Sequence, residues 1–403
     1  MFSEEHKAAG VTYPQGFTAA GVRAGIKKSG NLDVAVIYTE KEAAVAGVFT
    51  QNQVAAAPIR VSKIVVDTGT AHAVVANAGC ANACTGEQGL RDAEQMAEIA
   101  AKELHCRQDD VVVASTGVIG VNLPMDKMEA GIKDAVKNLS REGSVNAGNA
   151  IITTDTYSKA GATEVEIGGK LVRFGVIAKG SGMIQPNMAT MLCFITTDAD
   201  IDQKLLQEAL SEITEVTFNM ISVDGDMSTN DMVTVLANGA AGNPKITEKN
   251  SDYEKFYSTL ENICRELSKK IAADGEGATK FLTINVHGAE NFFDAKQIGM
   301  SVAKSPLVKT AFFGEDPNWG RVICAVGYSG VKINPASTVV KFGGIPVYAH
   351  GVGADYDANA LKKVMSAHDI AIDIELGIGK TSATVWSCDF SYEYVKINGE
   401  YHT

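Results

Sequence analysis

Hydrophobic positions recur at helical steps in four stretches of the chain. The clearest stretch is 252–273, and its apolar positions are Phe256, Leu260, Ile263, Leu267 and Ile271. Because residues three and four apart lie on one face of a helix, this spacing predicts an amphipathic helix. The same periodicity predicts helices over residues 91–105, 126–139 and 202–217. Asp126, two residues after Pro124, is the expected N-cap of the second of these. We interpret all four apolar faces as core.

Short runs of β-branched residues lie between the predicted helices and are typical of strands, several of them buried on both faces. These runs are residues 34–38, 73–75, 111–113, 281–286 and 338–342. The helices and strands do not alternate strictly, which favours a layered α+β architecture over a doubly wound sheet. A length of 403 residues indicates two or three structural units.

Composition narrows the class of protein. The net charge is −12 and no long basic run occurs, which argues against a nucleic-acid partner because phosphate binding needs clustered Lys and Arg. No apolar stretch is long enough to predict a membrane span. The first seven residues are charged and polar, unlike a secretory signal. We therefore expect a cytoplasmic protein.

No metal or cofactor site is predicted. The seven cysteines are expected to be free thiols in a reducing compartment. Cys80 and Cys84 lack a second pair, so we expect them to be buried in a turn and not to bind zinc. Gly379-Lys380-Thr381 resembles the end of a phosphate-binding loop, but Ile374 occupies the position that needs glycine. The histidines show no pairing in sequence with an acid or a nucleophile, and we interpret them as structural or exposed.

The stretch 178–199 carries the most chemical information. A glycine-rich loop with a proline runs into an apolar strand that begins at Thr190. A Thr hydroxyl is a weak nucleophile, and the α-amine of an N-terminal Thr can serve as its base. That amine has a reference pKa of about 7.7–8.0. Cleavage between Ala189 and Thr190 would therefore create base and nucleophile together. Taken alone, the same letters also fit an ordinary loop and strand.

The whole stretch closely resembles the self-cleavage site of the ornithine acetyltransferase family, the glutamate N-acetyltransferases of arginine biosynthesis. The family pattern is a Lys-Gly-Ser/Ala-Gly-Met loop followed by Ala-Thr-Met-Leu, and both are intact here at 179–183 and 189–192. Further matching segments are 114–120, 152–156, 219–231, 274–280, 316–321 and the end of the chain. The resemblance covers essentially all 403 residues.

The resemblance implies an enzyme that cuts itself into chains 1–189 and 190–403, with Thr190 at the start of a buried strand in the layered fold of that family. Thr190 would take acetyl from N-acetylornithine as an ester and pass it to glutamate. The family usually assembles as two copies of each fragment, a heterotetramer. It needs no cofactor, although some members also accept acetyl-CoA as donor, and no motif separates the two kinds.

The resemblance also implies the site residues. Thr116 and Gly117 would form the oxyanion hole, although they also fit a turn after the strand 111–113. Lys179 and Glu276 would bind the charged groups of the amino acid; each also fits a solvated loop. Thr153 would contribute a hydroxyl contact, with a strand-end cap as the alternative. Together with Thr190, the remaining substrate-binding residues would be Asn398 and Thr403.

Asn398 and Thr403 lie at a chain end, where residues are normally frayed. If they line the site, the tail must be held in place, and the run 385–397 could dock as a strand to do so. Two other functions remain open at this point. One is a self-cleaving amidase or aminopeptidase in which water accepts the acyl group, and the other is an uncut binding protein.

Overall fold

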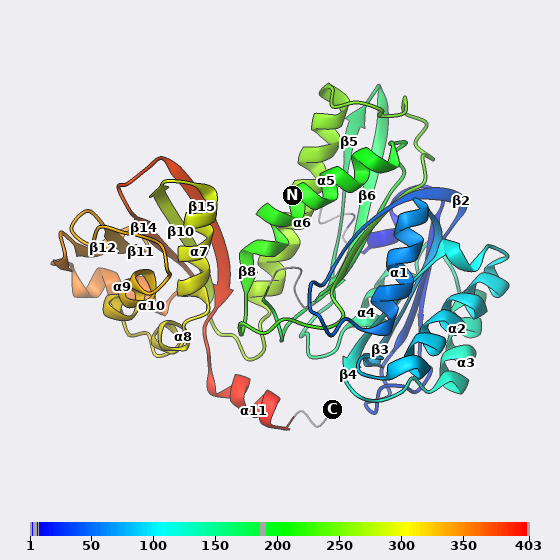
Figure 1. Cartoon of the computed structure of the whole chain (residues 1–403), viewed down its shortest axis with the longest axis horizontal. Helices are drawn as coiled ribbons and strands as arrows, with labels where there is room; N and C mark the ends of the chain where they lie inside the picture. The colour runs from blue at the N-terminus through cyan, green and yellow to red at the C-terminus, as the bar shows by residue number, and fades with distance from the viewer. Residues whose placement is uncertain (1, 3–5, 7, 186–190, 401–403) are drawn as a thin grey trace.

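Two β-sheets and the helices that cover them make up the molecule. In the computed structural model, residues 2, 6, 8–185 and 191–400 are described. The first sheet has eight strands in the order β4-β3-β2-β9-β7-β6-β5, with β1 paired to β2, and the second has seven in the order β13-β12-β11-β14-β10-β15-β8. Figure 1 shows the second sheet at the left and the first sheet at the right.

The strands of the first sheet are β1 (Phe17–Val22), β2 (Val34–Phe49), β3 (Thr70–Cys80), β4 (Val111–Val118), β5 (Lys159–Ile167), β6 (Lys170–Lys179), β7 (Leu192–Thr197) and β9 (Met232–Ala237). Those of the second are β8 (Ile221–Ser222), β10 (Phe281–Ala289), β11 (Val339–Phe342), β12 (Ile345–Ala349), β13 (Val352–Gly353), β14 (Asp369–Glu375) and β15 (Thr381–Cys388). The helices are α1 (Ala57–Thr68), α2 (Gly86–Leu104), α3 (Met125–Lys137), α4 (Ser144–Ile151), α5 (Gln203–Val216), α6 (Ser251–Ala273), α7 (Phe292–Ala303), α8 (Pro306–Phe313), α9 (Trp319–Gly327), α10 (Ala358–Ser366) and α11 (Tyr392–Glu400), with 3-10 turns η1 (Gly10–Thr12), η2 (Gln108–Asp110) and η3 (Phe218–Met220).

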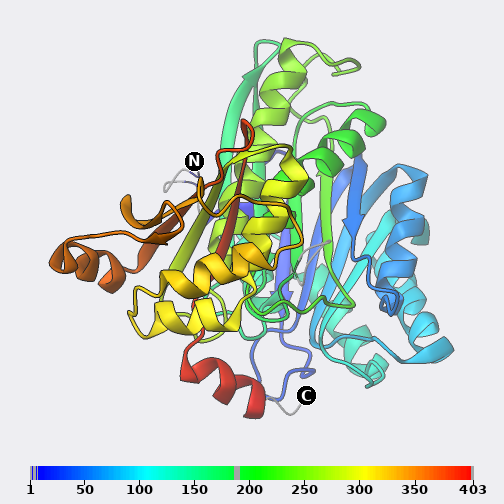
Figure 2. The same cartoon turned by 60° about the vertical axis from the view of Figure 1, so that its left-hand side comes forward.

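Helix α6 joins the two sheets into one core. It contacts β5 of the first sheet and β15 of the second, and its buried face includes Phe256, Leu260 and Leu267. Helices α5 and α6 share a single apolar cluster with both sheets, while α2 and α3 pack in a separate cluster against β3 and β4. Figure 2 shows the sheets and helices stacked in layers. The predicted α+β architecture is confirmed.

The first sheet interleaves strands from both sides of residue 189. Strands β9 and β7 lie between β2 and β6: β7 pairs with β6, and β9 pairs with β2. A cut between Ala189 and Thr190 would therefore leave each fragment hydrogen-bonded to the other on two strand boundaries. Both residues lie outside the described part of the chain, so the cut stays a prediction.

The four predicted helices are confirmed as α2, α3, α5 and α6, and the five predicted strands lie in β2, β3, β4, β10 and β11. One helix start was wrongly predicted. Pro124 occupies the N-cap position of α3, and Asp126 lies inside the first turn. Proline has a φ angle suited to a helix start and no N–H to satisfy, while the Asp126 carboxylate favours the positive end of the helix dipole.

Two further expectations are corrected. Cys80 is buried at the end of β3, but Cys84 is exposed. The run 385–397 does not continue as a strand, because β15 ends at Cys388 and α11 follows. Just after Cys388, the Asp389 carboxylate accepts hydrogen bonds from the backbone N–H groups of Thr279 and Lys280. These side-chain bonds take the place of the backbone bonds that a longer strand would make.

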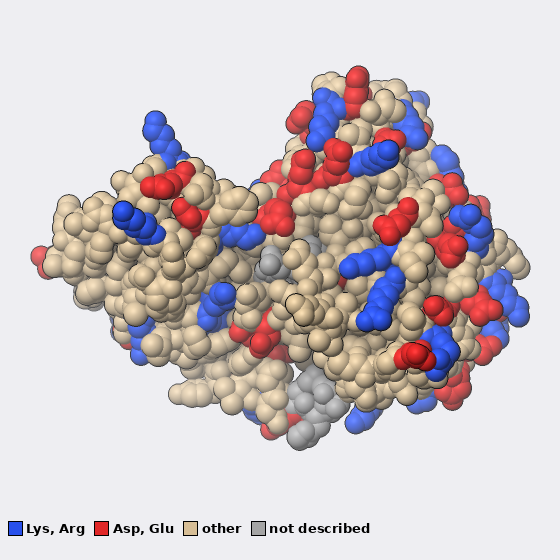
Figure 3. All heavy atoms as spheres, in the orientation of Figure 1, with Lys and Arg blue, Asp and Glu red and all other residues tan. Residues whose placement is uncertain are grey.

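The surface carries both signs of charge close together. On the face drawn in Figure 3, Lys and Arg side chains are interspersed with Asp and Glu. No helix in the described ranges is long and apolar enough to cross a membrane.

Candidate active site

One pocket gathers residues from segments far apart in the sequence. It lies at the ends of β4 and β6, has a cavity volume of about 120 Å³ and opens to solvent. Its lining comprises Ala81, Thr116, Gly117, Ile119, Thr153, Thr154, Lys179, Gly182, Met183, Ser228, Thr229, Asn230, Glu276 and Asn398. Six residues predicted from the sequence therefore share one cavity.

Thr116 and Gly117 lie within strand β4, not in a turn after it. Gly117 has φ +128°, and a Cβ atom on it would lie 2.5 Å from the carbonyl carbon of Gly79 in β3. Only glycine fits such a conformation and such a close approach. The pairing of β4 with β3 is irregular at this point, and such irregularities often re-aim backbone groups near active sites.

Lys179 ends β6 and is buried, with its ammonium aimed at two hydroxyls. Its Nζ donates to Thr153 Oγ1 at 2.9 Å and to Thr116 Oγ1 at 3.4 Å. Burial lowers the pKa of Lys179, and the nearby Asp155 carboxylate acts in the opposite direction. Thr153 lies in the loop after α4 and does not cap a strand.

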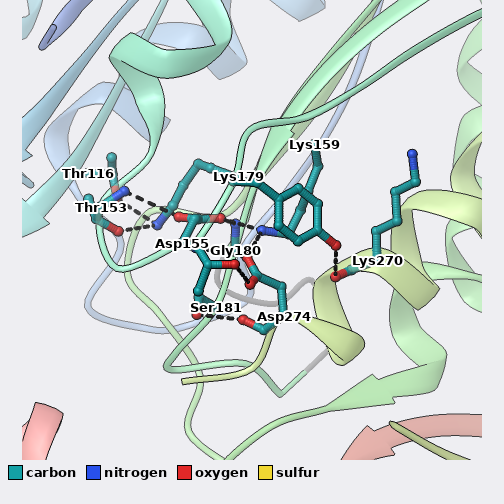
Figure 4. Close-up of polar contacts among 11 residues, drawn as sticks. Thr116, Thr153, Asp155, Lys159, Lys179, Gly180, Ser181, Lys270 and Asp274 are labelled. Atoms are coloured by element: carbon teal, nitrogen blue, oxygen red, sulfur yellow. Dashed lines mark hydrogen bonds and ion pairs between the residues drawn. The ribbon is translucent and has the colours of Figure 1, made fainter. Parts of the chain in front are cut away.

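Lys179 belongs to a buried charge cluster that also contains Asp155, Lys159 and Asp274. Lys159 Nζ bridges Asp155 Oδ1 and Asp274 Oδ2, each at 2.6 Å. In Figure 4, the Asp155 carboxylate lies between the two lysine ammonium groups, and Asp274 lies below them. Two cations and two carboxylates balance in the cluster, as buried charges require.

Glu276 and Asn398 form another part of the pocket lining. Asn398 Nδ2 in α11 donates to Glu276 Oε2 at 2.8 Å. The Glu276 N–H donates to the carbonyl of Ser181 at 3.0 Å. A Cβ atom on Gly182 would lie 2.3 Å from the Glu276 carboxylate, so glycine is needed there for the carboxylate to reach the pocket.

Asp231 is a residue that the sequence reasoning left without a role. Its Oδ1 accepts the N–H of Met191 at 2.9 Å, and its Oδ2 is buried without a hydrogen-bond partner in the part of the chain described. Burial raises the pKa of Asp231 well above its usual value. The neighbouring Asn230 lines the pocket and donates to the carbonyls of Ala81 and Ser115. The only sequence signal was that both residues fall in the matching segment 219–231.

The other predicted site residues, Ala189, Thr190 and Thr403, lie outside the described residues. The pocket nevertheless lies close to residues on both sides of 186–190. Gly182 and Met183 line it, and the N–H of Met191 donates to Asp231, the neighbour of the lining residue Asn230. Within the described ranges, no group of three or more His, Cys, Asp or Glu residues could hold a metal ion.

Comparison with known proteins identifies relatives over the full length. The model of the ArgJ family matches residues 18–403. The arginine biosynthesis bifunctional protein ArgJ of Symbiobacterium thermophilum is 50% identical over 401 residues, covering 99% of this chain and 100% of its own. ArgJ 1 of Clostridium acetobutylicum is 48% identical, covering 96% of each chain.

A solved structure also matches. The crystal structure of the arginine biosynthesis bifunctional protein ArgJ from Bacillus halodurans aligns with a TM-score of 0.50 at 43% identity, covering 51% of this chain and 97% of its own. Family model, curated relatives and solved structure agree on one family. The chain belongs to the ArgJ family.

Proposed function

We propose that this chain is an acetyltransferase of arginine biosynthesis that cuts itself between Ala189 and Thr190. It transfers acetyl from N-acetyl-L-ornithine to L-glutamate through an ester on Thr190. Full-length relatives named for arginine biosynthesis support the pathway. We further propose that the enzyme acts in the cytoplasm, without a cofactor, as two copies of each fragment.

The observation that carries the proposal is that one cationic and one anionic side chain line the same pocket. Lys179 offers an ammonium and Glu276 a carboxylate. An amino-acid substrate offers a carboxylate and an ammonium, so each charged group has a partner of opposite sign. Thr116 and Gly117 line the same cavity, where donors can stabilise the negative charge that develops on a carbonyl oxygen under attack.

The cut and the transfer use the same oxygen. In the cut, Thr190 Oγ attacks the Ala189 carbonyl carbon, the C–N bond breaks, and the hydroxyl proton goes to the released amine. Water then hydrolyses the ester, leaving the Ala189 carboxylate and the free Thr190. The solved Bacillus halodurans chain aligns over almost its whole length with about half of this one, which supports a polypeptide of fragment size.

In the transfer, the α-amine of Thr190 takes the Oγ proton as Oγ attacks the acetyl carbon of N-acetylornithine. The amide C–N bond breaks, and ornithine leaves with that proton on its amine. The amine of glutamate then attacks the acetyl ester and loses a proton, and the Thr190 oxygen leaves as a hydroxyl. N-acetylglutamate is the product, and the enzyme is regenerated.

An acetyl-transfer assay tests the proposal. Purified protein is incubated with N-acetylornithine, with and without glutamate, and ornithine and N-acetylglutamate are quantified. Transfer predicts equal amounts of the two products and little ornithine when glutamate is omitted. Ornithine and acetate released at the same rate without glutamate would favour the amidase alternative, and no turnover would favour a binding protein. Acetyl-CoA with glutamate, in the same assay, tests the second donor.

A further inference from the structure

The Lys179 ammonium lies in a buried environment that disfavours its charged form. It is buried, and burial lowers its pKa, because a low-dielectric surrounding disfavours the ammonium. The charged groups around it are Asp155 in the loop after α4, Lys159 at the start of β5, Glu276 after α6 and Asp231 before β9. Lys27, whose own pKa burial lowers to about 8, adds a second repelling cation.

Asp155 is the leading opposing charge, and it also holds the two segments on either side of the ammonium. Its Oδ1 accepts the N–H of Gly180, the residue after Lys179, at 2.7 Å. Its Oδ2 accepts the N–H of Thr153, whose hydroxyl accepts from Lys179, at 3.2 Å. The Asp155 carboxylate therefore fixes the backbone next to Lys179 and the backbone of Thr153, whose hydroxyl accepts a hydrogen bond from Lys179.

The rest of the charge cluster fixes Asp155. Lys159 binds its Oδ1 at 2.6 Å and is itself held from the other side by Asp274 at the same distance. Asp274 accepts the N–H of Thr156 at 3.1 Å. Figure 4 shows the Asp155 carboxylate between the Lys179 and Lys159 ammonium groups, and Asp274 next to Lys159. The two carboxylates have similar burial and share a partner, but only one is placed to act on Lys179.

We propose that Asp155 is a positioning residue for substrate binding, which fixes Lys179 beside Thr153 and supplies the buried negative charge that keeps the Lys179 ammonium charged for the substrate carboxylate. The role in substrate binding rests on the proposed function. The electrostatic part concerns Lys179 itself and can be measured separately.

The sign of the effect follows from the charges. The pKa of Lys179 is lowered by burial, and Asp155 raises it. Without the Asp155 charge the pKa falls further, and Lys159 is left to repel Lys179. The ammonium is then lost at a lower pH than in the wild type. Above that pH a neutral amine faces the substrate carboxylate, so substrate binding weakens first at the alkaline end.

The test compares Asp155→Asn with Asp274→Asn. Each removes one carboxylate charge from the same cluster, and kcat and KM for N-acetylornithine are measured across pH. In Asp155→Asn we expect KM at the alkaline end to rise about tenfold or more, as for loss of a bond to a charged group, with kcat less affected. The alkaline limb of kcat/KM moves to lower pH. In Asp274→Asn the limb stays near the wild-type position.

A charge-balance variant separates electrostatics from loss of fold. In Asp155→Asn/Lys159→Gln the repelling cation is removed as well, so the alkaline limb should return part of the way towards the wild type. A merely structural role for Asp155 predicts that the double variant is no better than the single one. Equal limb shifts in Asp155→Asn and Asp274→Asn, or no rescue in the double variant, overturn the proposal.

Direct titration keeps this inference separate from the proposed function. In protein with 13C-labelled lysines, the Cε signal that is missing from Lys179→Met reports the Lys179 charge without any substrate. A fall in its titration midpoint in Asp155→Asn, but not in Asp274→Asn, supports the electrostatic role even if the acetyl-transfer assay fails. An unchanged midpoint in Asp155→Asn overturns that role even if the assay succeeds.

Discussion

The two sides of the pocket are built in opposite ways. On one side, the side chains of Asp155 and Lys159 are fully buried, and each has its charge paired. On the other, α11 has no buried residue, and Tyr392 and Val395 are 83% and 70% exposed. The charge cluster forms a fixed wall, whereas the tail reaches the pocket through the exposed Asn398, which donates to Glu276.

The buried cluster and the exposed tail are suited to different roles. If Lys179 binds substrate as proposed, a wall of mutually paired buried charges holds its ammonium in one geometry beforehand, which reduces the cost of ordering it on binding. A helix with few buried apolar contacts can open locally at low cost in free energy. We therefore expect changes in the cluster to lower the free energy of unfolding as well as substrate binding, and changes in the tail to lower activity without a loss of stability.

The largest effect on stability is expected at the centre of the cluster. Lys159→Met leaves the carboxylates of Asp155 and Asp274 buried without their shared cation. Breaking a buried pair from one side costs about 3–5 kcal/mol. The free energy of unfolding, measured by urea denaturation, should fall by that amount. A fall as small as that of a surface substitution would contradict the fixed-wall description.

The tail should show the reverse behaviour. Deleting residues 398–403 removes the Asn398 contact to Glu276, and residues 398–400 are exposed. We expect acetyl transfer to be lost while the unfolding free energy stays within about 0.5 kcal/mol of the full chain. Circular dichroism with urea and the acetyl-transfer assay measure the two quantities. Retained activity would remove Asn398 and Thr403 from the site.

A single hydrogen bond in the tail should have a smaller effect. Asn398→Ala loses the donor to Glu276 Oε2, and a bond to a charged group contributes about 1.5–3 kcal/mol when buried. Because Asn398 is exposed, we expect a rise in KM of only about fivefold. Val395→Ser on the same helix is the matched control, and KM should not change there. Equal effects in the two variants would show that the helix as a whole, and not the Asn398 contact, matters.

Local patterns predicted four of the helices and five of the strands in the described ranges, and the resemblance to a family supplied the candidate residues of the site. Periodicity predicted α6, and the motif segments named Lys179 and Glu276. The cluster behind them could not be predicted, because Asp274 meets Lys159 only after α6 has packed between the two sheets. The strand predicted for the tail was wrong because it also depended on contacts between distant residues. Asp389 ends β15 through bonds to Thr279 and Lys280, which lie more than a hundred positions away in the sequence.

The central claim is that the bond between Ala189 and Thr190 is cut by the chain itself. Denaturing electrophoresis of the purified protein, with N-terminal sequencing of each band, tests it most directly, with Thr190→Ala as the control. We predict two wild-type fragments of 189 and 214 residues, the second beginning Thr-Met-Leu-Cys, and a single full-length band from Thr190→Ala. A single full-length wild-type band, identical to that of the variant, would contradict the account.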